Sequence, residues 1–245
     1  MRTVWFITAL VLAAVTAGAQ ERITRGADKT HAVRMLTGNP GAATYAWEVT
    51  PAAGTSTSLA GVTDSTATIV WDGPPGVYTL WVSVIDGNGC LGEQISREVE
   101  ILAPGDLVFA AAMPSTIICS DLAGGAEGSA EPHTQSHFQV VYEGESNLAS
   151  ATFTIQNPAG QYVDAAGSVL ANQGSPEITV DNDGDDNAID LAVADAWENA
   201  GSAEVQFTVT LVSVTTVDSA VIAADPETDV VRTITVLPKP VIAFD

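Results

Sequence analysis

Basic residues are scarce in this chain. It has 8 Lys and Arg residues against 30 Asp and Glu residues, which gives a formal net charge of −22. Four of the eight lie within residues 22–34, and Arg97 is the only one between residues 35 and 231. Such acidity repels nucleic acids and anionic lipids, so we exclude nucleic-acid binding. It favours cations, or a salty environment in which the repulsion is screened. The plain alternative is that the acidity serves the solubility of a secreted protein.

Long apolar runs are also lacking beyond the start of the chain. Residues 4–15 form one apolar run behind Arg2, and the small residues 17–19 are typical of a cleavage site. This run is shorter than the roughly 20 residues that span a bilayer. We therefore expect residues 1–19 to be a cleaved signal peptide and predict no membrane span. The mature protein is expected to be secreted or at the cell surface, with the periplasm as an alternative.

Long helical periodicities are absent, whereas alternation with the period of a β-strand recurs. Residues 69–71 and 77–85 alternate on either side of a Pro- and Gly-rich turn, and Trp47 lies in the alternating segment 44–50. Residues 203–217 alternate for longer than an ordinary strand, which predicts a bend or bulge. The fold class is therefore all-β. We predict two consecutive Ig-like β-sandwich domains, residues 20–104 and a larger one at 105–245.

Cysteine is nearly absent, since the chain has only Cys90 and Cys119. In an exported protein such a pair favours a disulfide, here across the predicted domain boundary. The alternative is two free buried thiols.

One acidic segment, residues 181–187, could bind a cation. Alternating acids in a tight loop can supply the six to eight oxygen atoms that calcium prefers. The candidate ligands are Asp181, Asp183, Asp185, Asp186 and Asn187. The segment does not follow the EF-hand pattern, so a solvated hairpin turn is the alternative.

Catalytic motifs are lacking, since the sequence has no nucleophile elbow, phosphate-binding loop or zinc-protease motif. His133 and His137 have a spacing seen in metal sites, but a second pair of ligands is missing. We therefore predict a non-enzymatic protein. A secreted hydrolase, the alternative, would need two close carboxylates or a histidine with partners.

Aromatic residues make up only 6% of the chain, but several gather in the first half. They are either core residues of a sandwich or a platform for glycans, which would make the chain a carbohydrate-binding module. The set comprises Tyr45, Trp47, Trp71, Tyr78 and Trp81.

Residues 28–104 resemble the PKD-like domains of Bacteroidota cell-surface and gliding-motility-associated proteins. The resemblance rests on Y-A-W-E-V at 45–49, A-T-I-V-W at 67–71, G-V-Y-T-L-W-V at 76–82 and N-G-C at 88–90. R-T-I-T-V-L-P at 232–238 resembles a repeat end in the same proteins. The resemblance implies spacers, adhesins or assembly parts. We therefore expect a structural or adhesive component of a cell-surface or extracellular assembly.

The apolar residues 241–244 suggest how such an assembly could form, because they could add a strand to another subunit. Protein partners or self-association are therefore the expected interactions.

Overall fold

The computed structural model describes residues 20–55, 57–59, 62–112, 115–119, 136–165, 167–174, 176–182, 186–193, 199 and 201–238. These residues form strands, turns and loops. None of them belongs to a helix that could cross a membrane. The predicted signal peptide, residues 1–19, and the apolar segment 240–245 lie outside the described residues.

The first seven strands form two facing sheets. One sheet has the order β1-β7-β6-β3-β4, and the other pairs β2 with β5. The bounds are β1 Glu21–Thr24, β2 Ala27–Ala32, β3 Thr44–Pro51, β4 Thr57–Ser58, β5 Thr66–Trp71, β6 Gly76–Ile85 and β7 Ile95–Leu102. Strand β1 pairs parallel to β7, and the chain then turns at Gly26, whose φ is +90°, into β2 of the facing sheet. We call this unit the N-terminal sandwich.

Alternation in these strands builds the core of the N-terminal sandwich. Ala67, Ile69 and Trp71 of β5 are buried, and so are Leu80 and Val82 of β6. Intervening side chains of β5 are exposed. The predicted alternation around the turn at residues 72–76 is therefore confirmed.

The remaining strands form a second pair of sheets, the C-terminal sandwich. A sheet of order β14-β10-β8 faces one of order β12-β11-β15-β17-β9, in which β13 pairs with β11 and β16 with β15. The bounds are β8 Leu107–Phe109, β9 Thr116–Cys119, β10 Ser136–Tyr142, β11 Leu148–Gln156, β12 Tyr162–Val163, β13 Ile178–Asp181, β14 Ala188–Val193, β15 Val205–Thr216, β16 Val221–Ala223 and β17 Val231–Leu237.

Strand β15 contains the predicted irregularity. Its buried side chains stand at odd-numbered positions as far as Leu211 and at even-numbered positions from Val214 onward. The pairing with β11 shifts register at the same place, where Phe153 is opposite Leu211 and Thr152 opposite Ser213. The extra residue is a bulge, which lets both halves of a long strand face the core.

The all-β, Ig-like sandwich class predicted from the sequence is confirmed by these strands and sheets. Their hydrophobic residues form two separate clusters, one in each sandwich. The domain division between residues 104 and 105 stays a proposal, because Ala220 belongs to the N-terminal cluster although it follows β15.

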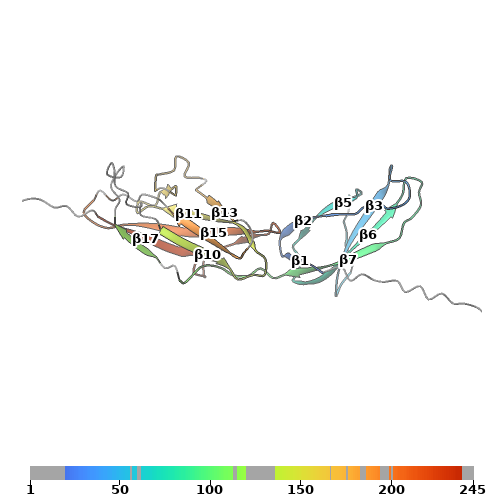
Figure 1. The fold of residues 1–245 in the computed structure, drawn as a ribbon, viewed down its shortest axis with the longest axis horizontal. Helices are drawn as coiled ribbons and strands as arrows, with labels where there is room; N and C mark the ends of the chain where they lie inside the picture. Colours follow the sequence, from blue (N-terminus) through green and yellow to red (C-terminus); the bar gives the residue numbers. More distant parts are fainter. Residues whose placement is uncertain are drawn as a thin grey trace, which may run out of the picture.

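The two sandwiches meet end to end at the turn between β15 and β16 (Figure 1). Ala220 in this turn is fully buried in the N-terminal core, and Ile222 packs against both clusters. The carboxylate of Asp218 accepts a hydrogen bond from the backbone N–H of Thr24 in β1. On the outside of the contact, Arg22 forms ion pairs with both Glu100 and Glu145.

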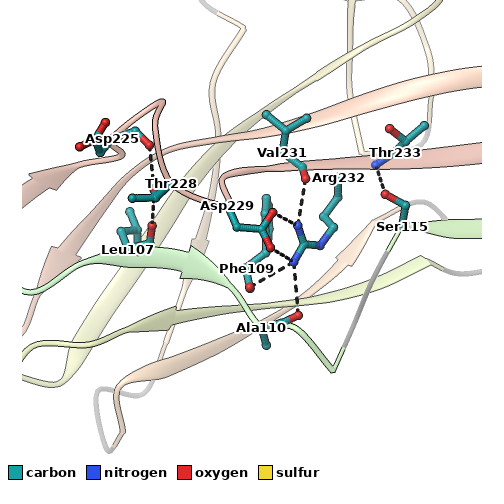
Figure 2. Close-up of polar contacts among 10 residues, drawn as sticks. All are labelled: Leu107, Phe109, Ala110, Ser115, Asp225, Thr228, Asp229, Val231, Arg232 and Thr233. Atoms are coloured by element: carbon teal, nitrogen blue, oxygen red, sulfur yellow. Dashed lines mark hydrogen bonds and ion pairs between the residues drawn. The ribbon is translucent and has the colours of Figure 1, made fainter.

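A buried arginine joins the facing sheets of the C-terminal sandwich (Figure 2). Arg232 of β17 is 5% exposed, and its Nη2 donates to the carbonyl oxygens of Phe109 (3.1 Å) and Ala110 (3.4 Å) beyond β17's own sheet. The guanidinium also pairs with Asp229 and lies 5.1 Å from the centre of the Phe109 ring. Its hydrogen bond to Asp229 lowers the pKa of that carboxyl.

Replacing this arginine should destabilise the protein more than replacing its carboxylate partner. Arg232→Met should lower the free energy of unfolding by roughly 3 kcal/mol, because the buried Phe109 carbonyl and the partly buried Ala110 carbonyl lose their donor. Asp229→Asn should lower it by less than about 1 kcal/mol, because the Asp229 side chain is 59% exposed. Urea unfolding of both variants measures the difference. Equal losses would show that the ion pair, and not the carbonyl contacts, stabilises this region.

Candidate functional site

Four ionisable side chains lie on core-facing positions of the N-terminal sandwich. On β1, Glu21 points to the same face as the buried Ile23, because the two are separated by one residue. On β2, Lys29 and His31 share a face with the buried Ala27 for the same reason. Arg97 has the parity of the buried residues of β7. Three strands from two sheets therefore bring one acid and three bases to the same end of the sandwich.

Glu21 connects the members of this group. Its carboxylate lies 3.1 Å from Arg97 Nη1, 3.6 Å from Lys29 Nζ and 3.7 Å from His31 Nδ1. The Glu21 side chain is 19% exposed, whereas that of Arg97 is 64% exposed. One carboxylate thus faces two fixed positive charges and a histidine.

A cavity of about 250 Å³ opens beside the group. Its inner wall is apolar and includes the buried side chains of Trp47, Leu80 and Val82, while Arg34 and Arg97 supply positive charge. The lining comprises His31, Ala32, Val33, Arg34, Trp47, Leu80, Val82, Ile95, Ser96 and Arg97.

His31 is the buried polar residue of the cavity. It is 6% exposed, and its Nε2 has no hydrogen-bond partner among the described residues. Its ring packs edge-on against Trp71 at 5.6 Å between centroids. Burial lowers the pKa of His31, and Arg97 and Lys29 act in the same direction against the opposing charge of Glu21. His31 is therefore neutral at pH 7.

The edge of β7 beside the cavity is open. Strand β1 covers Val99 to Leu102 on one side of β7, while β6 covers the other side as far as Ile95. Among the described residues, positions 95–98 have no strand on the β1 side. The neighbouring apolar side chains of Ile85, Leu91 and Ile95 are exposed.

The predicted calcium ligands are only partly described. Asp183 and Asp185 lie outside the described residues. Asp186 Oδ1 accepts from the N–H of Ala188 at 3.1 Å, and Asn187 Nδ2 donates to the Tyr142 carbonyl at 2.9 Å. Asp181 lies on β13 with an exposed side chain. Within the described part of the chain, no three His, Cys, Asp or Glu residues form a metal-binding group. Calcium binding stays a prediction.

The predicted disulfide is not formed in the structure, where Cys90 is an exposed free cysteine. The side chain of Cys119 is outside the described residues, but the backbone of β9 places it opposite Leu237 in the C-terminal sandwich. Cys90 instead lies in the turn after β6 of the N-terminal sandwich, where its N–H donates to Asp86 Oδ1 at 2.8 Å. The two cysteines belong to different sandwiches, as a bridge across the predicted domain boundary requires, so this placement does not contradict the predicted pairing.

The remaining candidates are the two histidines of the predicted metal spacing and the aromatic residues of the predicted glycan platform. His133 is outside the described residues, and His137 is exposed on β10. Trp47 and Trp71 are 1% and 2% exposed, so they are core residues and cannot form a glycan platform. The cavity group was not predicted from the sequence. The available signal was Arg97, a basic residue at a core-facing position of a strand.

The chain matches no protein-family model, and no curated protein matches it significantly. Among solved structures, fibronectin(III)-like modules of Clostridium thermocellum CbhA are 12% identical over 92% of each chain, with a TM-score of 0.34. The FN1–FN3 domains of chicken CNTN1 are 10% identical over 90% of this chain and 63% of that chain, with a TM-score of 0.40. A structure of Dpr2 Ig1–Ig2 in complex with DIP-Theta Ig1–Ig3 is 11% identical over 92% of this chain and 63% of that chain, with a TM-score of 0.26. Similarity at this level carries no inference about binding.

The neutral, buried state of His31 predicts that acid destabilises the N-terminal sandwich. The unfolded chain takes up a proton near the ordinary histidine pKa of about 6.5, while the folded chain resists it. The free energy of unfolding should therefore fall as the pH drops below about 6.5, by at most about 1.4 kcal/mol per pH unit for one proton. His31→Gln should flatten this slope between pH 7.5 and 5, measured by urea unfolding.

The control for this slope is His137→Gln, which changes an exposed histidine. Its slope should match that of the unmodified protein. If His31→Gln also left the slope unchanged, burial of a neutral His31 would be contradicted.

Proposed function

We propose that this chain is an exported, non-enzymatic structural component of a cell-surface or extracellular assembly, in which it acts as a rigid two-part spacer. The observation that carries the proposal is the β15–β16 turn, whose Ala220 is buried in the N-terminal core. Domains joined only by a linker move relative to each other by default. A shared core residue and a shared, partly buried carboxylate oppose that motion.

The sequence supports the finer part of this proposal. Residues 28–104 resemble PKD-like domains of Bacteroidota surface proteins, which serve as spacers and assembly parts. We propose protein partners or self-association as the interactions, and export through the signal peptide at residues 1–19. A carbohydrate-binding role is less favoured, because Trp47 and Trp71 are both in the core.

Removing the shared carboxylate should loosen the junction. Burial opposes the ionisation of Asp218, but hydrogen bonds from Thr216 and Thr24 outweigh it, so the pKa of Asp218 is lowered. Asp218→Ala removes the acceptor of the Thr24 N–H. We expect small-angle X-ray scattering to give one end-to-end arrangement for the unmodified protein and a broadened, more flexible ensemble for the variant.

Asp72→Ala is the matched control, because it removes the same charge at an exposed turn of the N-terminal sandwich. It should scatter like the unmodified protein. The rigid-spacer proposal fails if Asp218→Ala also scatters identically, or if the unmodified protein already behaves as two independent bodies.

Calcium binding is a separate proposal, with Asp181, Asp183, Asp185, Asp186 and Asn187 as the ligands. Light scattering of residues 20–245 should show a larger mass in calcium than in chelator if calcium supports assembly. Asp183→Asn combined with Asp185→Asn should abolish that difference, because two carboxylate ligands are lost. The chain mass in both solutions, together with no calorimetric heat from calcium, would reject the site.

A further inference from the structure

The cavity of the N-terminal sandwich combines two chemistries. Its inner wall is apolar, with Trp47, Leu80 and Val82 all at most 6% exposed. Arg34 and Arg97 also line it, and both are exposed. A ligand that suits both regions has an apolar body and a negatively charged group.

The positive charge at the cavity is not fully neutralised. Arg34 makes no ion pair among the described residues, and Arg97 uses Nη1 alone on Glu21 while 64% of its side chain stays exposed. Glu21 is also close to Lys29. Lys29 and Arg97 therefore share one carboxylate and Arg34 has none, in a chain whose net charge is −22.

Arg97 lies on the core-facing side of β7, where a charged side chain is unusual. A charge on a core-facing position is costly unless it is paired or hydrogen-bonded. Arg232 occupies a similar position on β17 and meets that requirement with two carbonyls and a carboxylate. Arg97 instead borders an open cavity, where its remaining donors can reach a ligand.

His31 adds a second, independent observation. It lines the same cavity, it is more than nine-tenths buried, and its Nε2 has no partner among the described residues. A neutral imidazole offers a hydrogen bond without adding charge.

We propose that this cavity binds a carboxylate carried on an apolar group, with the carboxylate on Arg34 and Arg97 and the apolar group against Trp47, Leu80 and Val82. A guanidinium matches a planar carboxylate through two parallel hydrogen bonds. A multiply charged anion such as phosphate is disfavoured, because the acidic surface repels it more strongly and the apolar wall gives it no contact. The ligand is either a free small acid or an acidic side chain within an apolar peptide. The proposal does not depend on the rigid junction.

Titration with phenylacetate and phenylacetamide, followed by amide chemical shifts, tests the proposal. The two probes have the same shape, but only phenylacetate is charged at pH 7. We expect phenylacetate to bind in the millimolar range and to shift the amides of His31, Arg34 and Arg97, while phenylacetamide binds at least tenfold more weakly.

Variants locate the site. Arg34→Met and Arg97→Met keep an unbranched apolar side chain but remove the charge, and each should weaken phenylacetate binding at least tenfold. Arg25→Met is the control, because Arg25 is exposed and its Nε donates to the Asp72 carbonyl outside the cavity. Unchanged melting temperatures would show that the variants fold.

A capped peptide of alternating Val and Glu distinguishes the source of the carboxylate. If it binds more tightly than phenylacetate and protects from exchange those amides of residues 95–98 that point away from β6, the ligand is a peptide added at the β7 edge. If only phenylacetate binds, the ligand is a small acid. Equal binding of phenylacetate and phenylacetamide, no shifts with either probe or the peptide, or binding unaffected by both Arg34→Met and Arg97→Met would overturn the proposal.

Discussion

Strand β1, only four residues long, links the junction of the two sandwiches to the cavity. At one end, the Thr24 N–H donates to the partly buried carboxylate of Asp218, which fixes β1 against the β15–β16 turn. At the other end, Glu21 holds Arg97, Lys29 and His31 around one carboxylate. Between them, buried Ile23 anchors the strand in the core. A shift of β1 along β7 would therefore disturb the junction and the cavity together, because its register with β7 sets both.

Two arginines, one in the last strand of each sandwich, both occupy core-facing positions but have different roles. Arg97 and Arg232 both lie on core-facing positions, where an unpaired charge is destabilising. The Arg232 guanidinium is enclosed by Asp229 and by the carbonyls of Phe109 and Ala110, so its donors serve the fold. Arg97 is mostly exposed beside a cavity, and among the described residues its guanidinium pairs only with Glu21. The first arrangement closes a sandwich, and the second leaves donors for a ligand.

Local alternation made much of the fold predictable, whereas long-range placement did not. The strands around residues 72–76 and the bulge in β15 follow from period-two patterning and from strand length alone. The cavity group could not be predicted in this way, because Glu21, His31 and Arg97 meet only once β1 pairs parallel to β7 and β2 crosses to the facing sheet. The disulfide was predicted from compartment alone, whereas the structure shows Cys90 as an exposed free cysteine. Asp218 gave no signal, since an acid in a turn is ordinary in sequence.

The acidity of the chain and its cationic cavity are compatible because they act over different distances. Charges spread over the surface act mainly beyond a Debye length, which is about 8 Å at physiological salt, and are strongly screened there. Arg34 and Arg97 act at contact distance, where salt screens a charge less than it does beyond a Debye length, and the apolar side chains of Trp47 and Leu80 line the same cavity. Moderate salt therefore reduces the repulsion of an approaching anion more than it weakens the contact itself. A monovalent acid with an apolar group is repelled least by the acidic surface and makes the most contact with the apolar side chains of the cavity. An acidic protein can therefore keep such a site.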